Sequence, residues 1–267
     1  MKKKLLTALT VLFAAVFCVS GFLAVRELRK GQKSRDFYRK LAEDVRQETS
    51  CTDRTEPPET EPVRQIPEEP AETFLLPEYA GLYQQNPDLV GWLTVPGTRI
   101  NYPVVQTPED PDHYLHLDFS GEYAACGCLY AQADCDVNAP SDNIVIYGHN
   151  MRDESMFGEL DAYEREEFWE EHRTILFDTL TEHREYEIVS VFKTFVYSDS
   201  PEAFPYYKFV SAENPEEFDA FLRRCRELQL YETGVDAEYG DRLITLSTCE
   251  YSRENGRLAV VAKQKIS

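Results

Sequence analysis

A cysteine and an arginine near the end of the sequence stand where a thiol and a guanidinium could share one site. Cys249 and Arg257 lie in RLITLSTCEYSRENGRLAVVAK, residues 242–263, where two runs rich in β-branched residues flank a short polar stretch. Asn255-Gly256 in that stretch is a strong β-hairpin signal. Because hairpin strands are antiparallel, the segment predicts that Cys249, ending one strand, lies close to Arg257, starting the next.

These residue types suit nucleophilic catalysis. A thiol attacks as the thiolate, which a nearby cation favours, while arginine stays protonated and offers several donors to a developing oxyanion. His149 is the candidate proton carrier, because it follows NIVIYG and so lies just past a predicted strand end. Spacing alone leaves the ordinary alternatives open: a buried or disulfide-bonded cysteine, a solvated arginine and a structural histidine. The other histidines lie in polar or helical surroundings and are predicted at the surface: His113, His116, His172 and His183.

Eight short runs with strand character must position these residues. They are LVGWLTV, RINYPVV, GCLYA, NIVIYG, TILFDTL, REYEIVSVFKTFVY, RLITLST and RLAVVAK, and they predict a barrel or sandwich core. Two helical segments are expected between them, around residues 156–172 and at residues 215–230. Cys225 shares a face of the second with large apolar side chains and is predicted to be core.

The N-terminal segment predicts a single membrane anchor. Residues 5–25 are 21 residues without a charge, enough to cross a hydrocarbon core of roughly 30 Å. The preceding lysines at positions 2–4 favour a cytoplasmic N-terminus, although basic residues also follow the run. A cleaved signal peptide would have a shorter apolar run, and bulky Phe17 before Cys18 argues against a lipoprotein.

Composition then divides the chain into three regions. We expect residues 1–30 to be the anchor and its flanks, 31–74 a juxtamembrane helix and a Pro- and Glu-rich linker, and 75–267 the folded domain. The net charge of −20, from 48 acidic and 28 basic residues, would repel phosphate backbones, so nucleic acid is not an expected partner.

The remaining cysteines suggest no cofactor. Cys126, Cys128 and Cys135 lie close together in sequence, but neither a C-x-x-C pair nor a nearby histidine accompanies them. We interpret them as small buried residues, and whether they are thiols or disulfides is left open. Carboxylates are too numerous to single out a glycosidase pair. No cofactor or metal site is predicted, and dependence on a metal is left open.

Three segments together resemble the class B sortases. They are NPDLVGWLTVPGTRINYPVVQ at residues 86–106, YGHNM at 147–151 followed by MFGEL at 156–160, and LSTC at 246–249 with RLAVVAK at 257–263. The likeness runs in order from about Leu75 to Lys263. It implies a mixed β-barrel of about eight strands with peripheral helices, preceded by a single transmembrane helix. The catalytic domain would lie outside the cytoplasm, on the membrane of a Gram-positive cell.

The resemblance also implies a reaction. Cys249 would attack the carbonyl after the Thr of a C-terminal sorting signal on a secreted protein, forming a thioacyl enzyme. His149 would protonate the leaving amine and later deprotonate the acceptor, an amine of a cell-wall precursor or a pilin lysine. Arg257 would bind the carbonyl or the tetrahedral oxyanion.

Substrate contacts are implied at four further positions, for which packing is the competing explanation: Leu115, Tyr147, Ser247 and Glu250. The chain departs from its relatives at Asp110-Pro111, where many have Asp-Asn, and at Tyr251, which is acidic in some. A plain cysteine peptidase and a non-catalytic, membrane-tethered binding protein remain the alternative functions.

Overall fold

The computed structural model describes residues 2–52, 75–138, 141–196, 200 and 202–265. The chain divides into two compact units, residues 1–40 and 41–267. The predicted Pro- and Glu-rich linker lies almost entirely at residues 53–74, outside the described residues.

The first element is one continuous helix, α1 (Lys2–Thr52). It contains the predicted juxtamembrane helix, and several of its large apolar side chains are exposed, among them Phe13, Phe17 and Phe22. Within the part of the chain that the structure describes, no helix combines the length and the apolar character that a membrane crossing needs.

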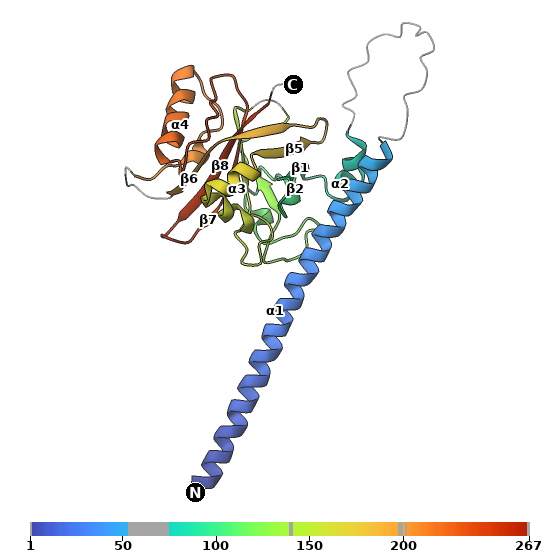
Figure 1. The fold of residues 1–267 in the computed structure, drawn as a ribbon. Helices are drawn as coiled ribbons and strands as arrows, with labels where there is room; N and C mark the ends of the chain where they lie inside the picture. The colour runs from blue at the N-terminus through green and yellow to red at the C-terminus, as the bar shows by residue number, and fades with distance from the viewer. Residues whose placement is uncertain (1, 53–74, 139–140, 197–199, 201, 266–267) are drawn as a thin grey trace. The chain divides into compact units, whose positions relative to one another are not determined.

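Eight strands close into a single barrel, in the order β1-β2-β3-β4-β7-β8-β6-β5 (Figure 1). Their bounds are β1 (Leu89–Thr94), β2 (Asn101–Val105), β3 (Leu129–Ala131), β4 (Asn143–Tyr147), β5 (Thr174–Thr179), β6 (Glu185–Phe195), β7 (Leu243–Glu250) and β8 (Gly256–Gln264). Every strand coincides with one of the runs predicted from sequence, although β7 and β8 continue slightly past theirs. The expected β-rich core is therefore confirmed, and it is a barrel rather than a sandwich.

The barrel is mixed. Strands β2 and β3 are parallel, as are β4 and β7, whereas the other neighbouring pairs are antiparallel. In β8 the five residues from Leu258 to Ala262 are fully buried, so both faces of this strand are covered. That explains why RLAVVAK reads as a continuous apolar run rather than as an alternating one.

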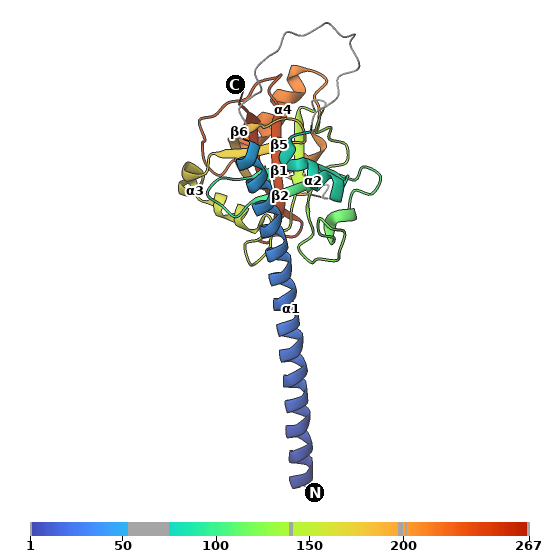
Figure 2. The same cartoon turned by 90° about the vertical axis from the view of Figure 1, so that its right-hand side faces the viewer.

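A helix covers the outer face of the barrel beside β6 and β8. Figure 2 shows α4 (Pro215–Leu228) in orange near the top of the barrel unit. Its side chains Phe218, Phe221, Leu222 and Cys225 belong to one buried cluster with Val189 and Val261. The helix begins at Pro215 because Asn214 Oδ1 accepts the Glu217 backbone N–H at 3.0 Å. The predicted core position of Cys225 is confirmed, and the helix ends two residues before the expected Leu230.

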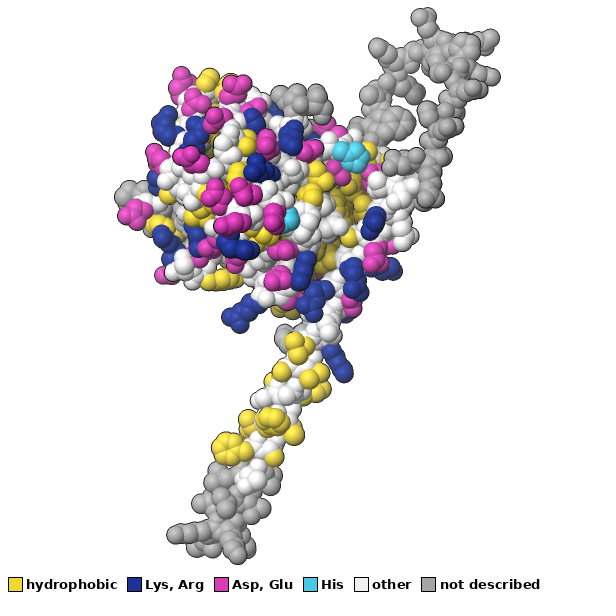
Figure 3. Space-filling model, viewed as in Figure 1, with side chains coloured by type: hydrophobic (Ala, Val, Ile, Leu, Met, Phe, Trp, Pro, Cys, Tyr) yellow, Lys and Arg dark blue, Asp and Glu magenta, His cyan; other side chains and the backbone are white. Residues whose placement is uncertain are grey.

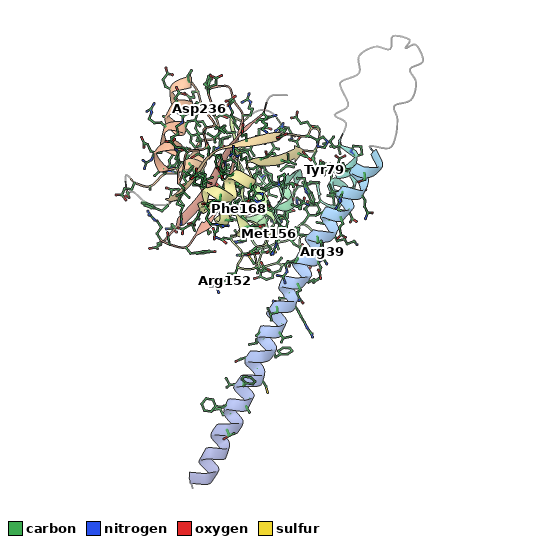
Figure 4. All side chains as sticks on the ribbon, viewed as in Figure 1. Arg39, Tyr79, Arg152, Met156, Phe168 and Asp236 are labelled. Carbon is green, nitrogen blue, oxygen red and sulfur yellow. The ribbon has the colours of Figure 1, made fainter. Side chains whose placement is uncertain are left out.

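The prediction of a single helix at residues 156–172 was wrong. Residues 156–172 form the 3₁₀ helix η2 (Gly158–Glu164) and the short helix α3 (Glu166–Glu171), separated by Arg165 in an extended conformation. Met156 has a φ of +52°, which cannot begin a regular helix. In Figure 4, Met156 lies within the barrel unit and Arg152 at its edge; the first is buried and the second exposed. The smaller elements are α2 (Pro77–Gln85), η1 (His113–Leu115) and η3 (Tyr206–Lys208).

Candidate active site

The predicted hairpin brings Cys249 and Arg257 together. Strands β7 and β8 are antiparallel, and Cys249 is the register partner of Arg257. Residues 251–255 make the turn, with Asn255 at a φ of +53°. Gly256 permits the close pairing, because a Cβ on it would lie 2.4 Å from the Glu250 carbonyl oxygen. The proximity predicted from the two runs and Asn255-Gly256 is confirmed at the level of the backbone.

His149 reaches the same edge of the barrel through a parallel neighbour. Strands β4 and β7 are in register up to Tyr147 and Ser247, so both chains leave the barrel at the same end. The alignment continues beyond β4, since the Thr248 hydroxyl donates to the Gly148 carbonyl at 2.9 Å. His149 and Cys249 therefore occupy matching positions at this end of the pair, and both are half-buried.

The ring of His149 is oriented by a backbone carbonyl. Its Nε2 lies 2.8 Å from the carbonyl oxygen of Leu115, at the end of η1. A carbonyl oxygen can only accept, so Nε2 carries the hydrogen and donates it. The other nitrogen, Nδ1, is left to take up and release a proton, as a general acid and base must.

A glycine lets the Leu115 carbonyl take its position. Gly127 has a φ of +58°, and a Cβ on it would lie 2.6 Å from the Leu115 oxygen and 2.7 Å from the Tyr114 oxygen. Both obstacles are backbone atoms, which cannot rotate away. By sequence Gly127 is only the first residue of the strand-like run GCLYA, yet it supports the hydrogen bond that orients His149.

We expect Gly127→Ala to lower kcat by roughly 10- to 100-fold, because a small displacement of a catalytic group is that costly. Gly121→Ala is the matched control: Gly121 has a φ of +80° in the same loop, but nothing lies within 4 Å of its Cβ position. Steady-state kinetics and thermal unfolding of both variants separate the clash from backbone strain. An equal loss of activity in the two would contradict a role for the Leu115 contact.

Asn150 joins the histidine loop to the cysteine strand. Its amide Nδ2 donates to the Cys249 carbonyl at 2.9 Å and to Asp161 Oδ2 at 2.8 Å. Partial desolvation raises the pKa of Asp161, with Glu164 and Glu250 adding to the rise and the Asn150 hydrogen bond opposing it. Sequence reasoning missed both residues. Asn150 carried a weak signal as a polar residue after a strand end, whereas Asp161 carried none.

Two of the four predicted substrate contacts are engaged within the protein. Ser247 is 1% exposed and shares a hydrogen bond of 2.5 Å with the Tyr206 hydroxyl. Glu250 is buried, and its carboxylate accepts from the Ser252 hydroxyl at 2.7 Å and faces Lys193 Nζ at 3.1 Å. Burial alone would raise the pKa of Glu250, but the hydrogen bonds from Ser252 and Lys193 outweigh it and hold that pKa below its ordinary value.

The other two are half-buried at the same edge of the barrel. The Tyr147 hydroxyl donates to Gln132 Oε1 at 2.6 Å, and Leu115 offers its carbonyl to His149. Contact with substrate stays a prediction for all four residues.

The structure answers whether the cysteines are thiols or disulfides. All six that it describes are thiols outside any disulfide: Cys18, Cys126, Cys128, Cys135, Cys225 and Cys249. Burial raises the pKa of the Cys135 thiol to about 11 and that of the Cys225 thiol further still. Cys249 is half-buried, whereas Cys126, Cys128, Cys135 and Cys225 are buried. No group of metal ligands occurs among the described residues.

The remaining histidines are not all alike. His113 and His183 are exposed as predicted, while His172 is half-buried with Nδ1 2.9 Å from the Pro96 carbonyl oxygen. His116 is exposed as well, but its ring is stacked on His149, with centroids 5.6 Å apart and planes 11° apart. Its polar surroundings in sequence gave no sign of this contact.

Comparisons with known proteins identify relatives over nearly the whole chain. The family described as Sortase domain matches residues 93–265. Sortase B of Staphylococcus aureus is 28% identical over 263 residues, covering 98% of this chain and 97% of the relative, and Sortase B of Listeria monocytogenes is 33% identical over 190 residues, covering 70% and 73%.

Solved structures agree with these sequence matches. The S. aureus sortase B–substrate complex aligns with a TM-score of 0.74 at 28% identity, covering 90% of this chain and all of that one. Sortase B from Bacillus anthracis in complex with AAEK1 aligns with a TM-score of 0.70 at 30% identity, again covering 90% of this chain and 100% of that one.

Proposed function

The chain belongs to the sortase family, within its class B, and from that premise we propose that Cys249, His149 and Arg257 carry out its reaction. As a member of that family it is a cysteine transpeptidase. The observation that carries the residue assignment is the register pair Cys249 and Arg257, next to a parallel strand that delivers His149. The resemblance in YGHNM, LSTC and RLAVVAK supports the same three positions.

In the first half of the reaction, the Cys249 thiolate attacks the carbonyl carbon of the Thr in a C-terminal sorting signal. Negative charge develops on the carbonyl oxygen, where the Arg257 guanidinium stabilises it. The C–N bond breaks as His149, protonated at Nδ1, gives its proton to the departing amine. The products are a thioacyl enzyme and the released C-terminal tail.

In the second half, an amine attacks the thioacyl carbon and gives its proton to Nδ1 of His149. The C–S bond breaks, Cys249 leaves as thiolate, and a new amide joins the secreted protein to its acceptor. Sortase B of S. aureus forms a complex with a substrate, and a solved sortase B carries triglycine, which supports peptide substrates and amine acceptors as classes. For this chain we propose a cell-wall precursor or a pilin lysine as the acceptor.

The N-terminal region is assigned to attachment. Residues 5–25 contain no charged residue, and the exposed Phe13, Phe17 and Phe22 of α1 would suit a hydrocarbon environment. We therefore place the anchor and its flanks at residues 1–30, the connecting segment at 31–74 and the catalytic domain at 75–267, outside the cytoplasm. Over the barrel unit, acidic and basic side chains are interspersed (Figure 3).

Transfer and hydrolysis are separated by their products. We expect synthetic sorting-signal peptides that contain Thr to be cut after that residue and, when triglycine is added, to appear in mass spectrometry as the triglycine conjugate. The amine should also speed turnover, because it resolves the thioacyl enzyme. Hydrolysis alone, at the same rate with and without triglycine, would mean a plain peptidase. Absence of cleavage across a panel that varies the residues before Thr would favour a non-catalytic binding protein.

A further inference from the structure

The exposed His116 lies face to face with the proton carrier of the proposed site. We propose that His116 is a positioning residue, whose ring holds His149 in the orientation that the reaction needs. This inference rests on the proposed function, because it assigns His116 a task in that reaction. It concerns the orientation of His149 and not contact with the substrate.

The first step of the argument is what the Leu115 hydrogen bond leaves undetermined. The bond of 2.8 Å fixes the position of Nε2 and the tautomer of His149. A single contact at one ring atom does not prevent the rest of a half-buried ring from tilting about it. Nδ1, on the other side of the ring, is displaced when the ring tilts, and it is also the atom that must meet the proton.

The second step is the contact that limits this tilt. The rings of His116 and His149 are 11° from parallel with centroids 5.6 Å apart, in the range of offset stacking. A ring lying along one face of His149 blocks movement toward that side, while the Leu115 carbonyl holds the edge. Together the two contacts determine both the plane and the position of the imidazole.

The third step is that His116 is itself held. Its carbonyl accepts the Ala124 backbone N–H at 3.0 Å, and Leu117 forms an antiparallel bridge with Tyr123. The Tyr123 ring, in the segment that this bridge closes, has its centroid 6.3 Å from that of the His116 ring. These contacts fix the backbone at His116, from which its ring reaches the face of His149.

The loop is also fastened to the barrel unit on both sides of His116. Before it, the Tyr114 hydroxyl donates to Asp88 at 2.8 Å; after it, the Phe119 carbonyl accepts from Asn86 Nδ2 at 2.9 Å. Asn86 Nδ2 also donates to the Tyr114 hydroxyl at 2.8 Å. Asn86 and Asp88 lie immediately before β1. The loop that carries the His116 ring is therefore hydrogen-bonded to the start of a barrel strand.

The test compares His116→Ala, which removes the ring, with His116→Phe, which keeps a flat ring and removes its nitrogens. His113→Ala is the matched control, because His113 is exposed in the same loop but packs on Tyr114. Using the full chain, we expect His116→Ala to lower kcat by roughly 3- to 10-fold, the factor that a lost ring stack is worth. KM for the peptide and for triglycine should not change. His116→Phe should stay within about twofold of wild type, and His113→Ala should match wild type.

Three outcomes would overturn the proposal. Unchanged kcat in His116→Ala would mean that the stack has no role. An equal loss in His116→Phe would assign the effect to the imidazole nitrogens, and a loss confined to KM would make His116 a substrate contact. Thermal unfolding of each variant separates these outcomes from a loss of folded protein.

A second measurement does not depend on turnover. Nitrogen-15 chemical shifts of the imidazoles report the tautomer, and we expect His149 to be predominantly the Nε2–H form in wild type and in His116→Phe. His116→Ala should shift those signals toward the average of a mobile ring. If the wild-type chain forms no triglycine conjugate, the proposed function fails, while these spectra still decide whether His116 holds His149.

Discussion

Cys249→Ala is expected to lower cleavage of a sorting-signal peptide by about 10⁴-fold or more, because it removes the atom that forms the thioacyl bond. The fold should survive, since the side chain is half-buried and alanine keeps the strand. We therefore expect thermal unfolding to change by no more than about 2 °C. Mass spectrometry of the mixed enzyme and peptide should show the thioacyl adduct for wild type and none for the variant.

Two other thiols of the barrel cannot take over. Cys135 and Cys225 are buried, and burial raises the pKa of both, so neither forms a thiolate near neutral pH. Cys18→Ala, at an exposed position on α1, is the control and should leave turnover unchanged. Substantial cleavage by Cys249→Ala, with the adduct still present, would place the nucleophile elsewhere.

Arg257→Lys is expected to lower kcat by roughly 10²-fold or more, although it keeps the positive charge. The loss follows from geometry. A guanidinium offers several donors in a rigid plane, and here Nη1 donates to the Gly256 carbonyl at 2.9 Å, which fixes part of that plane. A lysine ammonium on a flexible chain cannot keep this contact and also present parallel donors to an oxyanion.

The matched control is Arg253→Lys in the same turn. Arg253 is exposed and its guanidinium lies 5.2 Å from the ring centroid of Phe195, whose register partner on β8 is Gly256. Steady-state kinetics of both variants decide the role of Arg257. An unchanged rate would make Arg257 structural, and a rise in KM with kcat intact would indicate that it binds the ground state rather than the transition state.

The part of the site that was predictable is the part that is local in the chain. Cys249 and Arg257 are brought together by one hairpin, whose two apolar runs and Asn255-Gly256 are contiguous. The strand positions were predictable for a similar reason, because short apolar runs bounded by turn residues are typical of buried strands. Hydrophobic periodicity predicted one helix at residues 156–172, but the backbone conformations of Met156 and Arg165 divide it into two short elements.

Resemblance supplied what local pattern could not. His149 is one histidine among five, and a position after a strand end is shared by many residues. The motif YGHNM identified His149 through its resemblance to the sortase family. The physical cause is the parallel pairing of β4 with β7, which joins segments about one hundred residues apart and leaves no trace in the order of residues along either strand.

By itself, then, the sequence determined eight strands, the hairpin that pairs Cys249 with Arg257 and a charge-free N-terminal run, because each depends on residues close together in the chain. Local pattern left a barrel and a sandwich open, and resemblance implied the barrel that the tertiary structure has. Only the tertiary structure decided that the Leu115 carbonyl and the His116 ring contact the ring of His149. It also decided that Asn150 bonds the Cys249 carbonyl and that Glu250 is turned toward Lys193. These contacts join distant segments, and they depend on strand order and on the direction of each side chain, which no local pattern specifies.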